Sequence, residues 1–314
     1  MFTTNPHPHN PTHNPQHILI ITLMDSVIVT APAKVNLFLK VLSQRKDSYH
    51  NILTLFERIS LADTIKISKI PEGINVRSDV IITKNKKDNI AYKAADLILK
   101  YKKIKSGVRI DIKKRIPIAG GLGGGSSDAA ATLVGINKLF RLKLSDNILV
   151  KIGKKLGADV PFFLSNASFA IGRGRGDKLE VIESRSHFWH LLINPGIKLS
   201  TKEVYKAFDL TPNLADVKMN SLSKLQMDYA WIETMLYNDL EKAAISKKEI
   251  IGKILKGLAQ LLGRNAIVSG SGPSLFCLYR TRKEAIKAKK TVLSSVPARK
   301  RIGWQIFVVG TCYP

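Results

Sequence analysis

Residues 117–131 read PIAGGLGGGSSDAAA, and this stretch carries the most distinctive chemistry in the chain. Five glycines and two serines lie between a proline and an alanine-rich segment. Because glycine has no Cβ, backbone N–H groups in such a loop can approach an anion closely. A helix that begins there adds unpaired N–H donors and the positive end of its dipole. The composition predicts a phosphate-binding loop, whose serine hydroxyls could donate to phosphate or reach a magnesium ion.

The segments on either side of the loop support this interpretation. Val108, Ile110 and Ile112 recur at period two, which predicts a strand before the loop. An alanine-rich helix is expected from about Ser127, with Ser127 or Asp128 as its N-cap. A flexible linker is the alternative, but linkers are rarely placed between a period-two strand and an apolar helix.

Two familiar phosphate-binding motifs do not fit the loop. A Walker A loop has a lysine before its serine or threonine, whereas here Gly125 precedes Ser126. The dinucleotide-binding fingerprint needs glycine or alanine where Ser126 stands. The loop therefore predicts a phosphate site that belongs to neither class.

Three other polar residues could take part in phosphoryl transfer. Asp159 lies in the apolar segment GADVPFF, where burial would shape its basicity as a proton acceptor, although it could equally cap the next element. Lys34 and Asn36 lie in APAKVNLFL, where period two puts both on one strand face. There they could hold a carboxylate, a phosphate and a substrate hydroxyl in register. For an isolated lysine, a solvent-facing strand end is the simpler explanation.

A second group of residues could recognise a nucleobase. Tyr49 and His50 follow a turn-like KDS. A tyrosine ring can stack on a pyrimidine and a histidine can hydrogen-bond a base edge, although a packing pair at a strand entrance would look the same. Thr201 and Tyr205 lie one helical turn apart, and helix capping by Ser200 or Thr201 is an equally good explanation for Thr201.

The remaining chain alternates between strand and helix patterns. Period two predicts a strand over residues 35–41, and helical spacing predicts helices over 90–103 and from Ser145 to residue 156. Further helices are expected at 250–262 and 283–296, and further strands at 266–268, 274–278 and 305–309. The chain is thus a mixed α and β protein. Its 314 residues favour two domains, with a boundary between residues 165 and 191.

Composition narrows the class of protein. The net charge is +26, but the basic residues are spread over the folded region without a dense arm or interleaved aromatics, so solvated lysine-rich faces explain it best. The charge would also attract nucleotides and phosphorylated metabolites, so it does not separate an RNA binder from an enzyme. Cys277 and Cys312 are too few for a disulfide framework or zinc site. With no apolar run of membrane-spanning length, we expect a soluble, cytoplasmic protein.

The amino end differs in kind from the rest. Residues 1–17 are rich in Asn, Pro, Thr and His without apolar periodicity, which predicts disorder. Four of the seven histidines lie there and could bind metal, but a low-complexity tail is the simpler interpretation. Residues 18–23 lack the basic lead and cleavage site of a signal peptide, and Met24 could be the true start.

The loop GGLGGGSSDAA resembles the ATP-binding loop of the GHMP kinases, which phosphorylate small molecules without a Walker lysine. Four further segments narrow the resemblance to the members that act on a cytidine diphosphate-linked methylerythritol: APAKVNLFLKV, DSYH, LGADVPFFL and SGSGPSLF. The resemblance implies a two-domain α+β GHMP kinase fold with the active site in the cleft between the domains. The expected divisions are a disordered Asn-, Pro- and His-rich extension at 1–23, an ATP-binding domain at 24–170 and a C-terminal domain at 171–314.

The resemblance also implies a role for each site residue. Asp159 would be the catalytic base, and Lys34 would orient it and stabilise developing charge. SGSGPSLF would close the site near the phosphates or substrate, although an ordinary tight turn explains it as well. Residues expected to bind substrate, including cytosine, are Asn36, Tyr49, His50, Thr201 and Tyr205. Residues expected to bind ATP are Pro117, Ile118, Ala119, Gly120, Gly121, Leu122, Gly123, Gly124, Gly125, Ser126 and Ser127, with Asn89, Ile90 and Lys114 near the adenine.

The implied reaction is ATP-dependent phosphorylation of the 2-hydroxyl of 4-diphosphocytidyl-2-C-methyl-D-erythritol, giving the 2-phosphate and ADP in non-mevalonate isoprenoid biosynthesis. The cofactors would be ATP and Mg²⁺, with Mg²⁺ arriving on ATP and in reach of Ser127 rather than held by dedicated ligands. We expect a small-molecule substrate, no nucleic-acid or membrane partner, and a monomer or weak dimer.

One position departs from the resemblance, and two alternatives stay open. Ser48 stands where the family has glycine in Asp-Gly-Tyr-His, which would strain the turn if a positive φ is needed. The chain could instead be another GHMP enzyme, such as a homoserine kinase or a mevalonate-pathway enzyme. It could also be a basic RNA-binding module whose glycine loop grips backbone phosphate.

Overall fold

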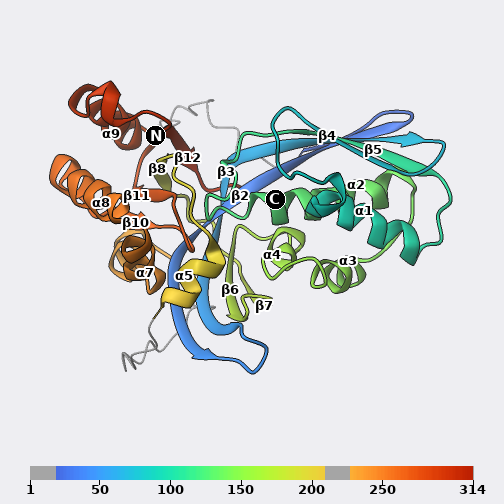
Figure 1. Cartoon of the computed structure of the whole chain (residues 1–314), viewed down its shortest axis with the longest axis horizontal. Coiled ribbons are helices and arrows are strands. Elements are labelled where there is room, and N and C mark those ends of the chain that lie inside the picture. The colour runs from blue at the N-terminus through green and yellow to red at the C-terminus, as the bar shows by residue number, and fades with distance from the viewer. Residues whose placement is uncertain (1–18, 209–226, 314) are drawn as a thin grey trace, which may run out of the picture.

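Two β-sheets carry helices on their outer faces, and two long strands run through the middle of the molecule (Figure 1). A computed structural model describes residues 19–208 and 227–313. The strands are β1 (Ile20–Thr22), β2 (Ser26–Gln44), β3 (His50–Ile70), β4 (Ile74–Ser78), β5 (Gly107–Lys113), β6 (Phe169–Gly174), β7 (Lys178–Ile182), β8 (Trp189–Asn194), β9 (Tyr237–Asn238), β10 (Ile267–Val268), β11 (Leu275–Tyr279) and β12 (Gln305–Gly310). The α-helices are α1 (Ile90–Tyr101), α2 (Gly124–Leu139), α3 (Asp146–Gly153), α4 (Val160–Leu164), α5 (Thr201–Ala207), α6 (Tyr229–Met235), α7 (Leu240–Lys247), α8 (Glu249–Leu262) and α9 (Arg282–Ser295).

The first sheet is built on β2 and β3, which pair antiparallel over almost their full length. Its order is β1-β2-β3-β5-β4, and β6 and β7 continue from the other end of β3. Much of β2 is buried on both faces, because helices cover one side and the second half of the molecule covers the other. Polar residues on β2 are therefore forced into the interior, where each needs a partner.

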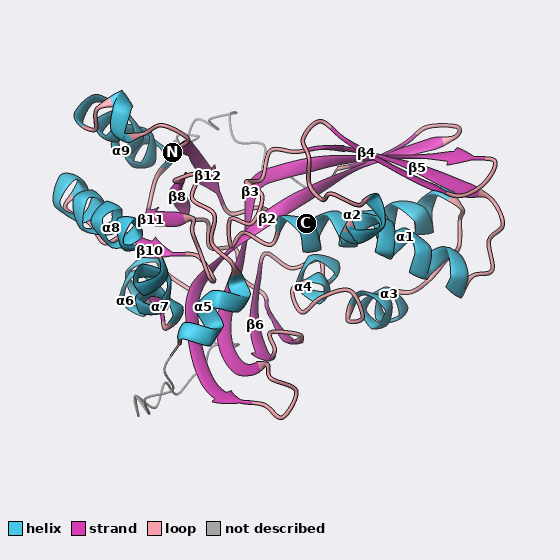
Figure 2. Cartoon of the chain, viewed as in Figure 1, coloured by secondary structure: helices cyan, strands magenta, loops and turns pink. Residues whose placement is uncertain are grey.

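Helices α1 to α4 cover one face of the first sheet, below it in Figure 2. Helix α2 approaches the sheet closely at Gly135. A Cβ added there would stand 2.5 Å from Cδ1 of Ile67 and 3.2 Å from Cγ2 of Val29. A larger residue would force those side chains to move, because the interior is close-packed. This close approach packs the second half of α2 directly on β2 and β3.

The second sheet has the order β10-β11-β8-β12, all antiparallel, and helices α8 and α9 lie on its outer face (Figure 1). Helix α8 buries one stripe, formed by Ile251, Ile254, Leu255 and Leu258, against this sheet. Among residues 19–208 and 227–313, no helix is both long and apolar enough to cross a bilayer.

A buried polar group joins the two sheets. Glu57 of β3 meets Nε2 of His190 on β8 at 2.9 Å and accepts a hydrogen bond from Oγ1 of Thr311 at 2.7 Å. The side chains of Glu57 and His190 have no exposed surface. A buried carboxylate is costly unless it is paired, so these contacts hold the two sheets in one relation.

The expected elements form, with differences at their ends. The helix expected from about Ser127 begins earlier, at Gly124, and its N-cap is Gly123, so capping by Ser127 or Asp128 was a wrong prediction. The Asp128 side chain is drawn away from the helix end by Lys114. The helix expected to reach residue 156 ends at Gly153, where the backbone tightens into turns.

The amino-terminal expectation needs one correction. Residues Ile20–Thr22 form β1 and pair with β2 opposite Val27, Ile28 and Val29, so disorder does not extend to residue 23. Residues 1–18, which include the four histidines, lie outside the described part of the chain. The domain boundary at residue 170 stays a prediction, while the strands change from the first sheet to the second between Ile182 and Trp189.

Replacing Ile98 by alanine tests the core under the first sheet. Ile98 on α1 is fully buried, so the loss of its methyl and methylene groups should lower the free energy of unfolding by about 2–5 kcal/mol. Ile250→Ala, on a side chain 48% exposed in α8, should change it by less than about 0.5 kcal/mol. Urea denaturation measures both, and equal effects would contradict this assignment of the core.

Candidate active site

A cavity of about 1190 Å³ lies between the glycine loop, the turn that joins β2 to β3, and helix α5. Every residue expected at the site lines this cavity except Ser127, which is buried in α2 and outside the lining. Ser126 faces the cavity instead. Segments more than 150 residues apart in the sequence therefore meet here, although their roles remain predictions.

The glycine loop needs its glycines for two reasons. Gly121 and Gly123 have φ of +76° and +70°, which residues with a Cβ rarely adopt. A Cβ on Gly121 would also stand 2.3 Å from the backbone oxygen of Ser269, and one on Gly123 would stand 2.9 Å from the Phe163 ring and 3.1 Å from Cγ of Lys34. No side chain caps the start of α2, so its first N–H groups can bind an anion.

Lys34 and Asp159 form an ion pair at the edge of the cavity, with Nζ to Oδ2 at 3.7 Å. The Lys34 side chain is 5% exposed and Asp159 is 31% exposed, so the ammonium is buried while the carboxylate reaches the cavity. Nζ of Lys34 also donates to Oδ1 of Asn36 at 2.5 Å, and Nδ2 of Asn36 donates to Oγ1 of Thr54 at 2.7 Å. Burial lowers the pKa of Lys34, and the Asp159 charge opposes that shift.

Asp159 owes its position to α4, whose N-cap it is, although its side chain makes no capping hydrogen bond. At the other end of this helix the fully buried Arg58 donates to the backbone oxygens of Phe162 and Phe163, at 3.1 and 3.4 Å. Since the carboxylate is not used for capping, it is available to accept a proton from a ligand in the cavity.

The end of the cavity beside the glycine loop contains a buried ionic cluster. The Lys114 ammonium pairs with Asp63 and with Asp128, the latter at 2.8 Å. Asp63 also accepts hydrogen bonds from the backbone N–H groups of Arg115 and Ile116. Burial raises the pKa of Asp128 to about 7; the Lys114 charge opposes this and the Asp63 charge adds to it. The cluster ties the end of β5 to the start of α2.

The opposite end of the cavity is built from aromatic rings. His50 and Tyr205 stack with ring centroids 5.3 Å apart, and the Arg175 guanidinium lies 5.2 Å from the Tyr49 ring centroid. Burial lowers the pKa of His50, which favours the neutral imidazole with one donor and one acceptor. Ser48 has φ +65°, so the turn does use the conformation for which glycine is preferred, and the serine is strained there.

Helix α5 resolves the alternative raised for Thr201. Ser200 is the N-cap and accepts from the N–H of Glu203, whereas Oγ1 of Thr201 lies 2.8 Å from Oγ of Ser271. Ser271 belongs to the SGSGPSLF segment, which forms the turn between β10 and β11 and lines the cavity. Burial, with the Asp159 charge, raises the pKa of Tyr205 and keeps its phenol neutral.

Comparison with known proteins gives a consistent result. Residues 89–167 match the GHMP kinases N terminal domain and residues 221–298 match the GHMP kinases C terminal domain. The 4-diphosphocytidyl-2-C-methyl-D-erythritol kinase of Syntrophus aciditrophicus is 37% identical over 90% of this chain and 98% of that protein. The same enzyme of Pelobacter propionicus is 40% identical over 85% of this chain and 94% of that protein. The chain belongs to the 4-diphosphocytidyl-2-C-methyl-D-erythritol kinase family.

Solved structures place this kinase within its superfamily. A crystal structure of 4-(cytidine 5'-diphospho)-2C-methyl-D-erythritol kinase matches with a TM-score of 0.72 and 30% identity, over 91% of this chain and all of that one. Homoserine kinase from Cytophaga hutchinsonii has the same TM-score at 20% identity, over 95% and 98%, which shows a shared fold. The expected GHMP kinase fold is confirmed, and the protein is a small-molecule kinase.

Some residues in or beside the cavity were missed by sequence reasoning. Asp63 gives no local signal, because it lies within a strand 51 residues from Lys114. Arg175 lies in the short turn between β6 and β7, where an arginine flanked by two glycines could have marked it as a candidate. Asp128 was considered only as a helix N-cap. A carboxylate next to a phosphate-binding loop nevertheless needs a cation beside it, and Lys114 supplies one.

Replacing Gly123 by alanine should weaken nucleotide binding. Both the positive φ and the contacts with Phe163 and Lys34 oppose a Cβ there, so the loop should shift and the dissociation constant for ATP should rise about tenfold or more. Gly257→Ala is the matched control, because nothing lies within 4 Å of a Cβ in that part of α8. Calorimetric titration would contradict the loop geometry if both variants bound ATP like the wild type.

Proposed function

We propose that the protein transfers the γ-phosphoryl group of ATP to the 2-hydroxyl of 4-diphosphocytidyl-2-C-methyl-D-erythritol. The observation that carries the proposal is the common cavity of the glycine loop, the Lys34–Asp159 pair and the His50–Tyr205 stack. The pair is close to both ends, because Lys34 touches the position of Gly123 and the Asp159 charge acts on Tyr205. Its curated relatives carry the name of this activity.

The reaction requires alignment and a proton acceptor. The 2-hydroxyl oxygen attacks the γ-phosphorus, the bond to the bridging oxygen of ADP breaks, and the hydroxyl proton passes to Asp159. Lys34 orients the carboxylate and stabilises negative charge as it develops. Asn36 keeps the ammonium in place and can itself face the acceptor.

The glycine loop and the start of α2 would hold the triphosphate, with Asn89, Ile90 and Lys114 near the adenine. Mg²⁺ prefers oxygen ligands, and this end offers the Ser126 hydroxyl and Oδ1 of Asp128. Among the described residues, Oδ1 of Asp128 is buried without a hydrogen-bond partner, so an ion brought by ATP would satisfy it. Bound there, Mg²⁺ would neutralise charge on the phosphates.

The aromatic end would take the cytidine diphosphate group. Tyr49 is 57% exposed, so its face is available for stacking on a pyrimidine. A neutral His50 can donate to and accept from the edge of cytosine. Arg175 adds a positive charge beside Tyr49 that suits a diphosphate. Within the described part of the chain, Cys277 and Cys312 are buried and form no disulfide, which suits the reducing cytoplasm, and we retain the expectation of a monomer or weak dimer.

A panel of acceptors tests the function directly. ADP release should depend on ATP together with 4-diphosphocytidyl-2-C-methyl-D-erythritol, and homoserine or mevalonate should not replace that acceptor. Turnover of either of those would favour another GHMP activity. Salt-sensitive RNA binding without ATP turnover would favour the nucleic-acid alternative.

Asp159→Asn tests the catalytic base. The amide keeps the shape but cannot accept the proton, so kcat should fall about 10²- to 10⁴-fold while ATP still binds. Asp146→Asn, at the exposed start of α3, should retain wild-type kcat. Single-turnover measurement with both substrates checks this, and a wild-type rate for Asp159→Asn would refute the assigned role.

Lys34→Met tests the buried ammonium. Burial lowers the pKa of Lys34 below its usual 10.5, so between the folded and unfolded pKa values the unfolded chain binds more protons, and the free energy of unfolding rises with pH there. Lys34→Met should abolish this rise and eliminate turnover, and it should lower the free energy of unfolding at pH 7 because Asp159 and Asn36 lose their partner. Lys66→Met, on an exposed lysine of β3, should change little. Urea denaturation over that pH range checks this, and a Lys34→Met variant that keeps the rise would contradict this account.

A further inference from the structure

Residues 237–241 join the two halves of the molecule next to the active-site cavity. Strand β9 pairs in parallel with Phe38 and Leu39 of β2. The N–H of Asp239 donates to the Leu39 oxygen at 2.9 Å, and Oδ2 of Asp239 accepts from the N–H of Val41 at 2.7 Å. This segment is thus attached to β2, the strand that carries two cavity-lining residues, Lys34 and Leu39.

Asn238 connects the same segment to the SGSGPSLF turn. Its amide nitrogen donates to the backbone oxygens of Val268 and Gly270, both at 2.7 Å, and its oxygen accepts from the N–H of Leu240 at 3.0 Å. Asn238 is 6% exposed. The Asn238 amide therefore donates to two backbone carbonyls at the start of this turn. Water cannot readily replace these hydrogen bonds, because the site is buried.

The turn held by Asn238 touches the reacting groups. A Cβ on Gly270 would stand 3.2 Å from Oδ1 of Asn36 and 3.4 Å from Nζ of Lys34. The next residue, Ser271, contacts Thr201 at the start of α5. Displacement of this turn would therefore be felt both by the Lys34–Asn36 pair and by the helix that carries Tyr205.

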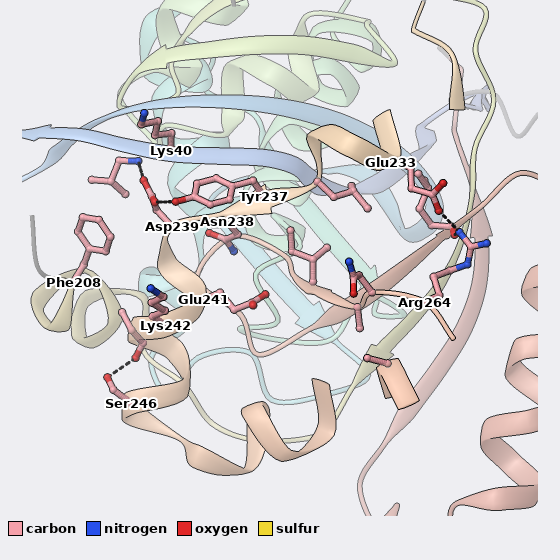
Figure 3. A pocket seen from close by; sticks show the side chains of 18 of the residues that line it. Lys40, Phe208, Glu233, Tyr237, Asn238, Asp239, Glu241, Lys242, Ser246 and Arg264 are labelled. Atoms are coloured by element: carbon pink, nitrogen blue, oxygen red, sulfur yellow. Dashed lines mark hydrogen bonds and ion pairs between the residues drawn. The ribbon is translucent and has the colours of Figure 1, made fainter. Parts of the chain in front are cut away.

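A second cavity, of about 980 Å³, is lined in part by this segment (Figure 3). Several charged groups on its wall are engaged by the chain itself. Asp239 meets the Val41 N–H and the Tyr237 hydroxyl, and Glu233 pairs with Arg264. Glu241 accepts from the N–H of Val268, which adds a further contact to the same turn. Residues 237–241 therefore connect β2 to the SGSGPSLF turn.

We propose that Asn238 is a positioning residue for phosphoryl transfer. It holds Gly270 against Lys34 and Asn36, and Ser271 against Thr201, and so sets the geometry in which the acceptor hydroxyl is presented. The inference rests on the proposed function, and it assigns no direct contact between Asn238 and substrate.

Asn238→Asp tests the inference with almost no change of shape. The variant loses both N–H donors and turns a carboxylate oxygen toward two carbonyl oxygens, so the turn should move. We expect kcat/KM for 4-diphosphocytidyl-2-C-methyl-D-erythritol to fall about tenfold to a hundredfold, since small misplacements have effects of that order.

Asn137→Asp is the matched control. The Asn137 amide donates to the oxygen and accepts from the N–H of Leu144, both at 3.0 Å, at the end of α2 away from the cavity. It should lose stability but retain kcat/KM at a temperature where both variants are folded. Should Asn238→Asp not fold, Asn238→Ser, which keeps one donor without a charge, supplies the same comparison.

The outcomes are distinguishable. An inactive wild-type protein overturns the proposed function and this inference with it. An active wild type whose Asn238 variant has unchanged kcat/KM, or loses no more than the Asn137 variant, overturns the inference alone. A selective loss of acceptor kcat/KM, accompanied by faster hydrogen exchange at the Gly272 amide, which donates to Ser269 within the turn, supports it.

Discussion

The site depends on one buried ammonium group. Lys34 lies inside a strand whose neighbours are apolar, and burial disfavours its charge. The Asp159 carboxylate and the Asn36 side chain compensate, and both must approach from fixed directions. The Phe56 ring, 5.4 Å from the ammonium, adds a weaker attraction. The need to satisfy this charge therefore links β2, β3 and α4, the elements that a phosphoryl transfer would use.

The same constraint explains why small residues surround the pair. The glycine loop passes over Lys34 at Gly123, and the turn from the second half reaches it at Gly270. Both glycines have positive φ. Glycine is favoured at each position because a Cβ would crowd Lys34 and because other residues rarely adopt this backbone conformation. Backbone from both halves of the molecule therefore approaches the same lysine, and main-chain atoms form the wall of the cleft beside it. Such a wall can bind phosphate oxygens without long side chains that would have to be ordered.

Stability and function place opposite demands on several positions. The Ser48 backbone is strained beside Tyr49 and His50, and Asp128 has an unsatisfied oxygen within the described structure. Features of this kind persist where the surrounding structure over-determines them and a ligand relieves them. The buried contact between Glu57 and His190 supplies rigidity away from the cavity.

Sequence alone determined the glycine loop, the strands and helices near it, and the placement of Lys34 and Asn36 on one strand face, because these follow from local spacing and side-chain size. Family resemblance added Asp159 and the aromatic pair. Only the tertiary structure showed that Asp63 and Asp128 share Lys114, that Ser126 rather than Ser127 faces the cavity, and that Asn238 holds Gly270. Two of these contacts join residues 51 and 32 positions apart, where no periodicity connects the partners. The exact start of α2 decided the third, since a shift of one residue turns a helical side chain by about 100°.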